Sequence, residues 1–434
     1  MNKKTKYTLL GILLLSSILH AWRLPIPKHA VFDEIHYATY AAQYVTRTPF
    51  FDVHPPFGKF LYSLPLHFVS KDALSDAPFV KLTRDTIVKY DEINRIFTTF
   101  PYILLRAISA FFGVLLVFAI FLFMRELTKN DAVALLSSLF ITLENSLLLE
   151  TRLILLDGAF LSLSFFALWQ FLKHKDTGFR SGILWGCALA IKLVGIIFLP
   201  FILFQKSGFW KNYKFITIGL LTLGILWIGI QWFSFSTRDW FSFMNSVNTN
   251  VSQDIPKIPE HLSFSQDASL KTYLLFREIV WSAQGYSTIQ ATHPAQSRWI
   301  EWPFMIGSFC YKEKAFPLCM IGNPALWAIG LLSLFVTLIY SILQWMRKKK
   351  IDEHIKMISL GYITTLIPFA IIPRYMFIYH YFPALIFSLC LSAYWMVFFI
   401  NKLEKKYQMV SYLILVSIVC VGFLAISPVT FGFK

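Results

Sequence analysis

Residues 98–124 read TTFPYILLRAISAFFGVLLVFAIFLFM, and this run contains a single charged side chain, Arg106. About 20 apolar residues are enough for a helix to cross the hydrocarbon core of a bilayer. Similar runs recur along the chain, which is 56% hydrophobic and 15% charged, whereas soluble domains contain about 25% charged residues. The sequence therefore predicts an all-α polytopic membrane protein with a single domain over residues 1–434.

The predicted spans are separated by basic clusters that indicate orientation. The predicted spans cover 7–22, 98–124, 131–149, 151–172, 181–205, 213–234, 324–345, 356–373, 375–399 and 409–427. Lys and Arg concentrate in cytoplasmic loops, and the clusters alternate correctly if the N-terminus is cytoplasmic and the C-terminus extracytoplasmic. The net charge of +16 is then topological information and does not indicate nucleic-acid binding.

One segment, 181–205, has basic residues on both sides and so cannot cross once without violating this rule. We expect a hairpin of two short helices that turns near Lys192, because Gly195 and Pro200 suit a broken segment. The hairpin brings the total to about eleven crossings and places Lys192 near the outer face. A single crossing that violates the charge rule is the alternative.

Two long loops, 23–97 and 235–322, are then extracytoplasmic. The apolar spacing in 31–47 predicts a helix that lies on the membrane surface, and Pro55-Pro56 favours a second one over 57–69. In the second loop, Cys310 and Cys319 are candidates for a hairpin disulfide.

Most of the unusual polar residues fall at the outer face of this predicted bundle. They are Asp33, Glu34, Asp52, His54, Arg106, Arg152, Asp157, Lys192, His293, Arg298, Glu301, Arg374, Tyr379 and His380. Ionisable groups near a membrane are costly and usually mark a site. Each also has a structural interpretation: Arg106 could neutralise a buried acid, Arg152 could pair with Asp157, and His54 could fix a turn.

These residue types suit glycosyl transfer from a polyprenyl phosphate at the membrane surface. Arginine and lysine bind phosphate, a carboxylate can accept the proton of an incoming hydroxyl, and Trp299, Trp302 and Tyr379 offer rings for stacking on a sugar. A single displacement with one acid as the base inverts the anomeric centre. The sequence lacks the spacing typical of a metal site, so we expect no metal and no cofactor apart from the lipid-linked donor substrate.

Several motifs resemble those of the protein O-mannosyltransferases, which belong to the GT-C superfamily of lipid-phosphate-dependent membrane glycosyltransferases. Asp33-Glu34 stands where this family has an acidic pair, and FDVHPPFGK at 51–59 resembles its DxHPPxGK segment. Further matches are Arg106, RLILLD at 152–157, GCALAIKLVG at 186–195, HPAQSRW at 293–299, WP at 302–303, GNP at 322–324 and PRYMFIYHYFP at 373–383.

The resemblance implies a GT-C bundle that transfers mannose from polyprenyl-phosphate mannose to Ser or Thr of an acceptor protein on the non-cytoplasmic face. It also implies Asp33 as the general base and Glu34 as a residue that positions the acceptor. The expected donor contacts are Arg106, Lys192, Arg298, Arg374, Tyr379 and His380, and the four basic residues among them either bind phosphate or hold the acids. Asp52, His54, Arg152, Asp157, His293 and Trp302 are expected in support.

The second loop departs from the eukaryotic members, which carry an additional soluble domain there. Residues 235–322 leave no room for it, so the size resembles the bacterial members and favours a bacterial cytoplasmic membrane. Two alternatives remain open. One is a related GT-C enzyme with another lipid-linked sugar or with a lipid or glycan acceptor. The other is a secondary transporter, which would fit the broken hairpin, although we find no inverted repeat.

Overall fold

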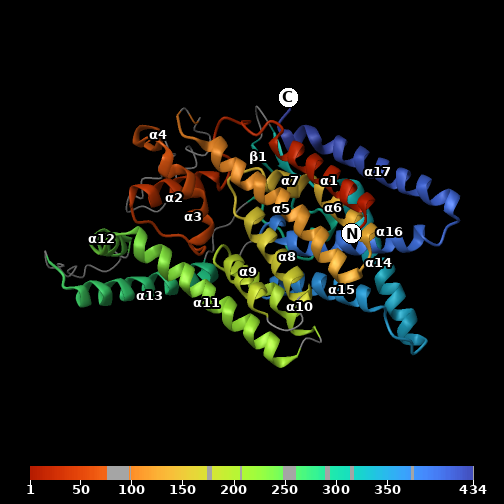
Figure 1. Cartoon of the computed structure of the whole chain (residues 1–434). Coiled ribbons are helices and arrows are strands. Elements are labelled where there is room, and N and C mark those ends of the chain that lie inside the picture. The colour runs from red at the N-terminus through yellow and green to blue at the C-terminus, as the bar shows by residue number, and fades with distance from the viewer. Residues whose placement is uncertain are drawn as a thin grey trace.

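A computed structural model describes residues 1–75, 97, 99–173, 178–205, 208–247, 261–288, 294–312, 317–372 and 376–433. Helices make up nearly all the regular structure of these ranges (Figure 1), and one two-stranded hairpin is the exception. This confirms the predicted helical fold class. His293 and Arg374, two predicted site residues, lie outside the described residues.

Within the described ranges, five helices are long and apolar enough to cross a membrane, judged by length and composition alone. They are α5 (Tyr102–Thr128), α11 (Phe209–Ser234), α14 (Pro324–Met346), α16 (Phe382–Ile400) with the preceding turn η6 (Ile378–Tyr381), and α17 (Lys405–Phe431). Other predicted spans correspond to α1 (Lys3–Ala21), α6 (Asp131–Thr142), α8 (Asp157–Lys173), α9 (Phe179–Leu189) and α15 (Glu353–Leu366). These are shorter or more polar, so the total of about eleven crossings stays a prediction.

The predicted span 131–149 is interrupted. Helix α6 ends at Thr142, and the short helix α7 (Asn145–Glu150) follows. Glu144 causes the interruption, because its buried carboxylate caps α7 by accepting the Ser146 N–H and also accepts the Asn323 N–H at 3.0 Å. A polar group buried in this way needs such partners.

The helices pack closely where glycine allows it. Helix α5 lies along α8, α8 lies along α9, and α9 lies along α11. A Cβ atom added to Gly186 of α9 would lie 2.5 Å from the carbonyl oxygen of Gly219 in α11, so these two backbones meet at a small-residue contact of the kind common between membrane helices. Helix α16 is buried along most of its length and contacts α6, α14 and α15.

The predicted break in 181–205 is present. Helix α9 ends at Leu189, and the 3₁₀ helix η3 (Leu193–Phe198) and helix α10 (Leu199–Leu203) follow. The Trp185 indole N–H donates to the Gly195 carbonyl at 3.0 Å, so the chain turns back beside α9. The hairpin prediction is confirmed, and Lys192 lies at its turn in an extended conformation.

The first long loop folds into α2 (Glu34–Thr46), α3 (Phe57–Ser63), η1 (Leu64–Phe68) and α4 (Lys71–Ser75). Helix α2 confirms the helix predicted over 31–47, and its position on the membrane surface stays a prediction. Its residues Ile35, Ala38 and Ala41 have no exposed surface, because α2 packs on α3 and η1. The apolar spacing in this helix therefore marks a protein core.

The second long loop contains α12 (Thr237–Val247), α13 (Phe264–Thr288), η4 (Trp302–Phe304) and the hairpin of β1 (Phe309–Lys312) and β2 (Leu318–Met320). The strands are antiparallel, with Cys310 paired to Cys319, and these two cysteines form a disulfide. The proposed pairing is thus present in the structure.

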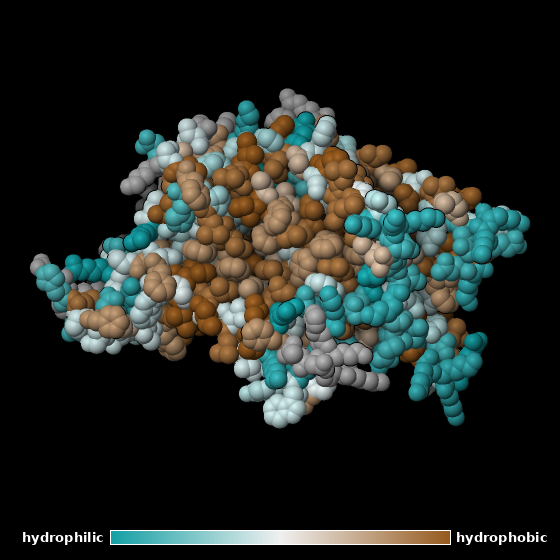
Figure 2. All heavy atoms as spheres, in the orientation of Figure 1, coloured by the Kyte–Doolittle hydropathy of each residue, from teal (hydrophilic) through white to brown (hydrophobic). Residues whose placement is uncertain are grey.

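The basic clusters gather away from these loops. Figure 2 shows hydrophobic residues over the middle of the visible face and hydrophilic residues at the end that carries the N-terminus. Arg347–Lys350 and Lys402–Lys406 are exposed, and Asp131 joins Thr5 of α1 to Arg125 of α5. The C-terminal end instead lies beside the end of α1, where Arg23 donates to the Phe431 and Gly432 carbonyls.

Candidate active site

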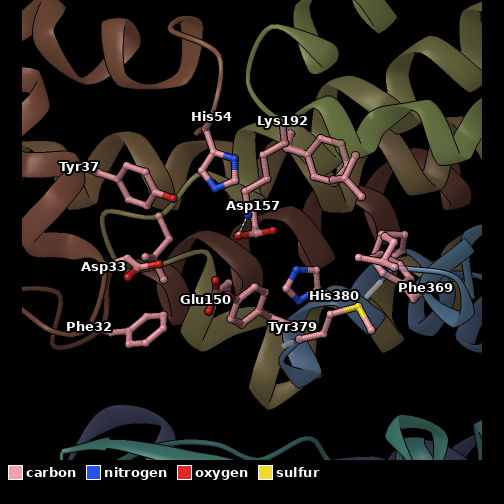
Figure 3. Close-up of a pocket in the computed structure, with 16 residues that line it drawn as sticks. Phe32, Asp33, Tyr37, His54, Glu150, Asp157, Lys192, Phe369, Tyr379 and His380 are labelled. Carbon is pink, nitrogen blue, oxygen red and sulfur yellow. Dashed lines mark hydrogen bonds and ion pairs between the residues drawn. The ribbon is translucent and has the colours of Figure 1, made fainter. Parts of the chain in front are cut away.

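One pocket collects side chains from both halves of the chain (Figure 3). The predicted residues among its lining are Asp33, His54, Asp157, Lys192, Tyr379 and His380. Phe32, Tyr37, Glu150 and Phe369 also line it. The pocket therefore lies at the meeting point of four segments: the first long loop, the α7–α8 turn, the α9–η3 break and η6.

Asp33 presents a free carboxylate to this pocket. It is the N-cap residue of α2, yet its side chain makes no capping hydrogen bond, although aspartate usually does so at this position. No described residue forms a hydrogen bond or ion pair with its carboxylate. Burial raises the pKa of the Asp33 carboxyl, while nearby His36 and Lys192 oppose the rise. A raised pKa makes the carboxylate a stronger proton acceptor.

The backbone before Asp33 is strained in a way that sets its direction. Phe32 has φ of 49°, which is unusual for a bulky residue and costs about 1–3 kcal/mol. Its ring is held in an aromatic cluster, with centroids 5.2 Å from Tyr311 and 6.0 Å from Phe309. The second long loop thus stabilises the turn that precedes Asp33.

Lys192 supplies the cation of the pocket. Its ammonium donates to Asp157 Oδ2 at 2.7 Å and lies 5.7 Å from the Tyr379 ring centroid. An ammonium has three donors, so the pair with Asp157 leaves capacity for a further anion. The alternative that Asp157 pairs with Arg152 is excluded, because Asp157 binds Lys192 here.

The DxHPPxGK segment folds on itself. Lys59, which is 2% exposed, donates to Asp52 Oδ2 and to the His54 carbonyl, both at 2.6 Å. Burial opposes ionisation of Asp52, but Lys59 outweighs it and lowers the pKa of that carboxyl. Burial lowers the pKa of His54 to about 3, so its imidazole is neutral near pH 7.

The glycine of this segment explains how the loop reaches the bundle. A Cβ on Gly58 would lie 2.8 Å from Leu156 and 3.0 Å from Ile191. The Phe57 N–H donates to the Ala190 carbonyl at 3.0 Å. The start of α3 therefore docks directly on the α9–η3 break that holds Lys192, and only glycine fits this approach.

Arg106 and Glu34 lie together outside the pocket lining. Arg106 donates to both Glu34 oxygens at 2.7 and 2.8 Å, and its remaining bonds go to the carbonyls of Leu24, Pro27 and His29. All five guanidinium donors are used, so Arg106 has none left for a phosphate. The predicted contact of Arg106 with the lipid-linked sugar donor is therefore corrected. Arg106 has the alternative role, which is to hold an acid.

Glu34 is equally saturated. Its carboxylate has no exposed surface and also accepts the N–H groups of Val31 and Ile154, each at 2.9 Å. The expected contact between Glu34 and an acceptor therefore has to be revised, because no face of the carboxylate reaches the pocket. The Glu34 carboxylate instead links the first long loop to the α7–α8 turn.

Arg152 also lies away from the pocket. Its guanidinium donates to the carbonyls of His20, Trp22 and Thr430 and lies 4.6 Å from the Phe431 ring centroid. It fastens the α7–α8 turn to α1 and α17. Its predicted supporting role is therefore structural.

Residues of the second loop form the wall behind η6. Trp302 has no exposed surface and its ring stacks 6.2 Å from that of His380, so it cannot stack on a sugar as expected. Arg298 is exposed and lines an adjacent groove with Gln296 and Trp299. This groove shares Phe369, Ile372 and Met376 with the main pocket.

Sequence reasoning missed Glu150, Lys59 and Phe32. Glu150 ends the apolar run LLLE and lines the pocket, so an acid at the close of a buried run was the available signal. Lys59 stood in the quoted DxHPPxGK segment but was given no role. Nothing in the sequence indicated the left-handed backbone of Phe32.

The fold and the pocket define a helical membrane protein of the GT-C type, an architecture seen in solved membrane glycosyltransferases. The chain is similar to a subunit of the Saccharomyces cerevisiae protein O-mannosyltransferase Pmt1–Pmt2 complex bound to the sugar donor, with a TM-score of 0.72 and 15% identity over 100% of this chain and 91% of that one. It is also similar to the Archaeoglobus fulgidus oligosaccharyltransferase, with a TM-score of 0.59 and 12% identity over 100% and 57% of the two chains. At these identities the likeness shows the fold.

Sequence comparison is more specific. The dolichyl-phosphate-mannose-protein mannosyltransferase model matches residues 11–245, and that of the C-terminal four TMM region of protein-O-mannosyltransferase matches 271–434. The chain belongs to the dolichyl-phosphate-mannose-protein mannosyltransferase family.

Two curated relatives are named dolichyl-phosphate-mannose–protein mannosyltransferase 4. The Candida albicans protein is 31% identical over 45% of this chain and 26% of its own length. The Schizosaccharomyces pombe protein is 32% identical over 44% and 25%. Each match thus spans about a quarter of the relative.

Proposed function

We propose that this protein transfers mannose from a polyprenyl-phosphate mannose to the hydroxyl of Ser or Thr in an acceptor protein, with inversion at the anomeric carbon. Membership of the family supports the substrate classes. The observation that carries the proposal is the Asp33 carboxylate, which faces a pocket that also holds Lys192 and makes no bond to any described residue. A base that is free of partners can accept the acceptor's proton.

The reaction needs one base and one site for the anionic leaving group. The acceptor hydroxyl loses its proton to Asp33 while its oxygen forms a bond to C1 of mannose. The bond between C1 and the phosphate oxygen breaks, and its electron pair stays on the phosphate. Because phosphate is already a good leaving group, no general acid is required.

Lys192 is the pocket residue best suited to stabilise the charge that develops on the phosphate. Its hydrogen bond to Asp157 fixes its direction. The exposed Arg298 in the adjacent groove offers a second cation to the donor. The apolar groups Phe369, Ile372 and Met376 line both the pocket and this groove and suit the first isoprene units.

Glu34 and Arg106 act here as positioning residues. The Glu34 carboxylate binds the backbone on both sides of the pocket, at Val31 and at Ile154. It therefore fixes the loop that carries Asp33 relative to the turn that carries Asp157. In this arrangement both outer loops face the non-cytoplasmic side, the N-terminus is cytoplasmic and the C-terminus is extracytoplasmic.

An assay with purified full-length protein tests the proposal. Polyprenyl-phosphate mannose and a Ser/Thr-rich peptide should give a mannosylated peptide, and the same peptide with Ala at every Ser and Thr should give none. Added chelator should leave the rate unchanged, since the proposal includes no metal. Absence of product with mannose, together with consumption of another lipid-linked sugar, would support the related GT-C enzyme instead.

A further inference from the structure

Polar contacts reach the pocket from the second loop and from the α9–η3 break. The Tyr311 hydroxyl in β1 donates to Glu150 Oε2 at 2.7 Å. Glu150 and Asp157 both line the pocket, and Asp157 accepts from Lys192 at 2.7 Å. Figure 3 shows Glu150, Asp157 and Lys192 gathered in the pocket.

The pocket brings Glu150 together with two other acids, Asp33 and Asp157, and with Lys192, and carboxylates that share a site disfavour each other's ionisation. Asp157 forms an ion pair with Lys192 at 2.7 Å. Glu150 is 3% exposed, and its hydrogen bond from a described residue comes from the neutral hydroxyl of Tyr311, an environment that favours its neutral form. The proton therefore belongs on Glu150.

We infer that Glu150 is a positioning residue that stays protonated in the active protein and thereby keeps the positive charge of Lys192 available to the donor phosphate. The inference rests on the proposed function for the identity of the donor. With Glu150 neutral, the charges of Lys192 and Asp157 balance. With Glu150 ionised, the pocket gains a negative charge beside both Lys192 and Asp33, and an incoming phosphate is repelled.

The β1–β2 hairpin fixes the position of Tyr311, which donates to Glu150. Tyr311 follows Cys310, whose disulfide with Cys319 closes the hairpin, and the Tyr311 ring packs against Phe32. The charged or titratable groups that face Glu150 are therefore Asp157 of α8, Tyr311 of β1 and Lys192 of the break. Asp33, Tyr379 and His380 complete the pocket around them.

Binding of a short-chain polyprenyl phosphate to the purified protein, measured from mildly acidic to alkaline pH, tests the inference. Wild type should bind roughly tenfold more weakly once Glu150 loses its proton, as expected for a like charge a few ångströms away. Glu150→Gln should lack this tenfold step, because its amide can accept from Tyr311 but cannot ionise, while any slope that Asp33 contributes is common to both proteins. An unchanged alkaline loss in Glu150→Gln would overturn the inference.

The matched control is Glu278→Gln. Glu278 is another buried acid of the outer region, where it accepts from Gln231 of α11, and it does not line the pocket. This variant should keep the wild-type pH profile. Infrared difference spectra give an independent measure: the carbonyl band of protonated carboxyl groups should be weaker in Glu150→Gln than in wild type, and an equal band in the two proteins would count against Glu150 as the carrier.

If Glu150→Gln does not fold, Tyr311→Phe serves instead. It removes the donor that stabilises ionised Glu150, so the alkaline loss should move to higher pH, and an unmoved midpoint would overturn the inference. Mannosyl transfer measured in parallel separates the two proposals. Binding with this pH dependence but no transfer refutes the function alone, whereas transfer with an unchanged profile in Glu150→Gln refutes the inference alone.

Discussion

Asp33 and Glu34 are adjacent in the chain, but their side chains enter two different charge clusters. Glu34 has no exposed surface and binds Arg106 and two backbone N–H groups. Asp33 faces the pocket across from Lys192 and makes no bond to any described residue. One acid has used every acceptor position on the protein itself, while the other keeps its positions for a ligand.

This difference separates structural from chemical roles more clearly than residue type does. A buried charge whose hydrogen-bonding capacity is complete holds two segments together. A charge with unused capacity in a cavity can bind or react. Arg106 and Lys192 divide in the same way, because Arg106 has no donor left and Lys192 has two.

The largest effect should come from Asp33→Asn. Removing a general base slows a reaction about 10² to 10⁴-fold, while folding should be intact because no described residue bonds to this carboxylate. Transfer rate and thermal unfolding are the two measurements. Asp72→Asn, in the exposed part of α4, should retain wild-type transfer. Loss of folding in Asp33→Asn would erase the contrast between the two acids.

Arg106→Met should instead destabilise the protein by about 3–5 kcal/mol, because it leaves Glu34 buried without its partner. The yield of folded protein and the thermal midpoint measure this. Adding Glu34→Gln should recover part of the loss, since it removes the buried charge, but the amide oxygen can accept from only one of Val31 and Ile154, whose N–H groups bind different oxygens of Glu34. If Arg106→Met were stable but bound the sugar donor weakly, the original prediction that Arg106 contacts the phosphate would be supported.

Lys192→Gln should raise KM for the donor about 10 to 100-fold, which corresponds to losing one charge-assisted hydrogen bond. Lys271→Gln is a suitable control, since Lys271 pairs with Asp267 in the second loop and does not line the pocket. An unaltered KM with a reduced kcat would mean that Lys192 does not contact the donor in its ground state.

Opening the hairpin should have a smaller effect. Cys310→Ser with Cys319→Ser removes a disulfide between residues nine positions apart and loosens Tyr311 and the Phe32 cluster. Transfer should fall severalfold with little change in the fold of the bundle, as measured by kcat and circular dichroism. Full activity in this double variant would show that the hairpin does not position the site.

The smallest effect concerns pH. Burial raises the pKa of Asp33, so transfer should fall as the pH drops through a value above the ordinary 3.9 or so of aspartate. The folded state favours the protonated form, so this group stabilises folding at low pH, and the advantage is lost as pH rises through the folded pKa. Asp33→Asn should therefore unfold at a slightly higher temperature at neutral pH. An acid limb at or below the ordinary value would contradict this environment.

The helical class, the broken segment at Lys192 and the gathering of several polar motifs in one place could all be predicted from the sequence. Hydrocarbon accepts only long apolar helices, and basic clusters mark their cytoplasmic ends. These rules act locally along the chain, so composition and spacing were sufficient. The same local rule does not tell what α2 packs against, because an apolar face buried in protein has the same spacing as one buried in lipid.

Tertiary structure alone decided which charged residues bind other parts of the protein and which face the pocket. Glu34, Arg106 and Arg152 stand in motifs as conspicuous as those of Asp33 and Lys192. Their partners lie many residues away, at Ile154, Leu24 and Thr430, and no spacing in the sequence records them. Which charges are satisfied and which stay free depends on those distant contacts, and those contacts leave Asp33, Lys192 and Glu150 lining one pocket.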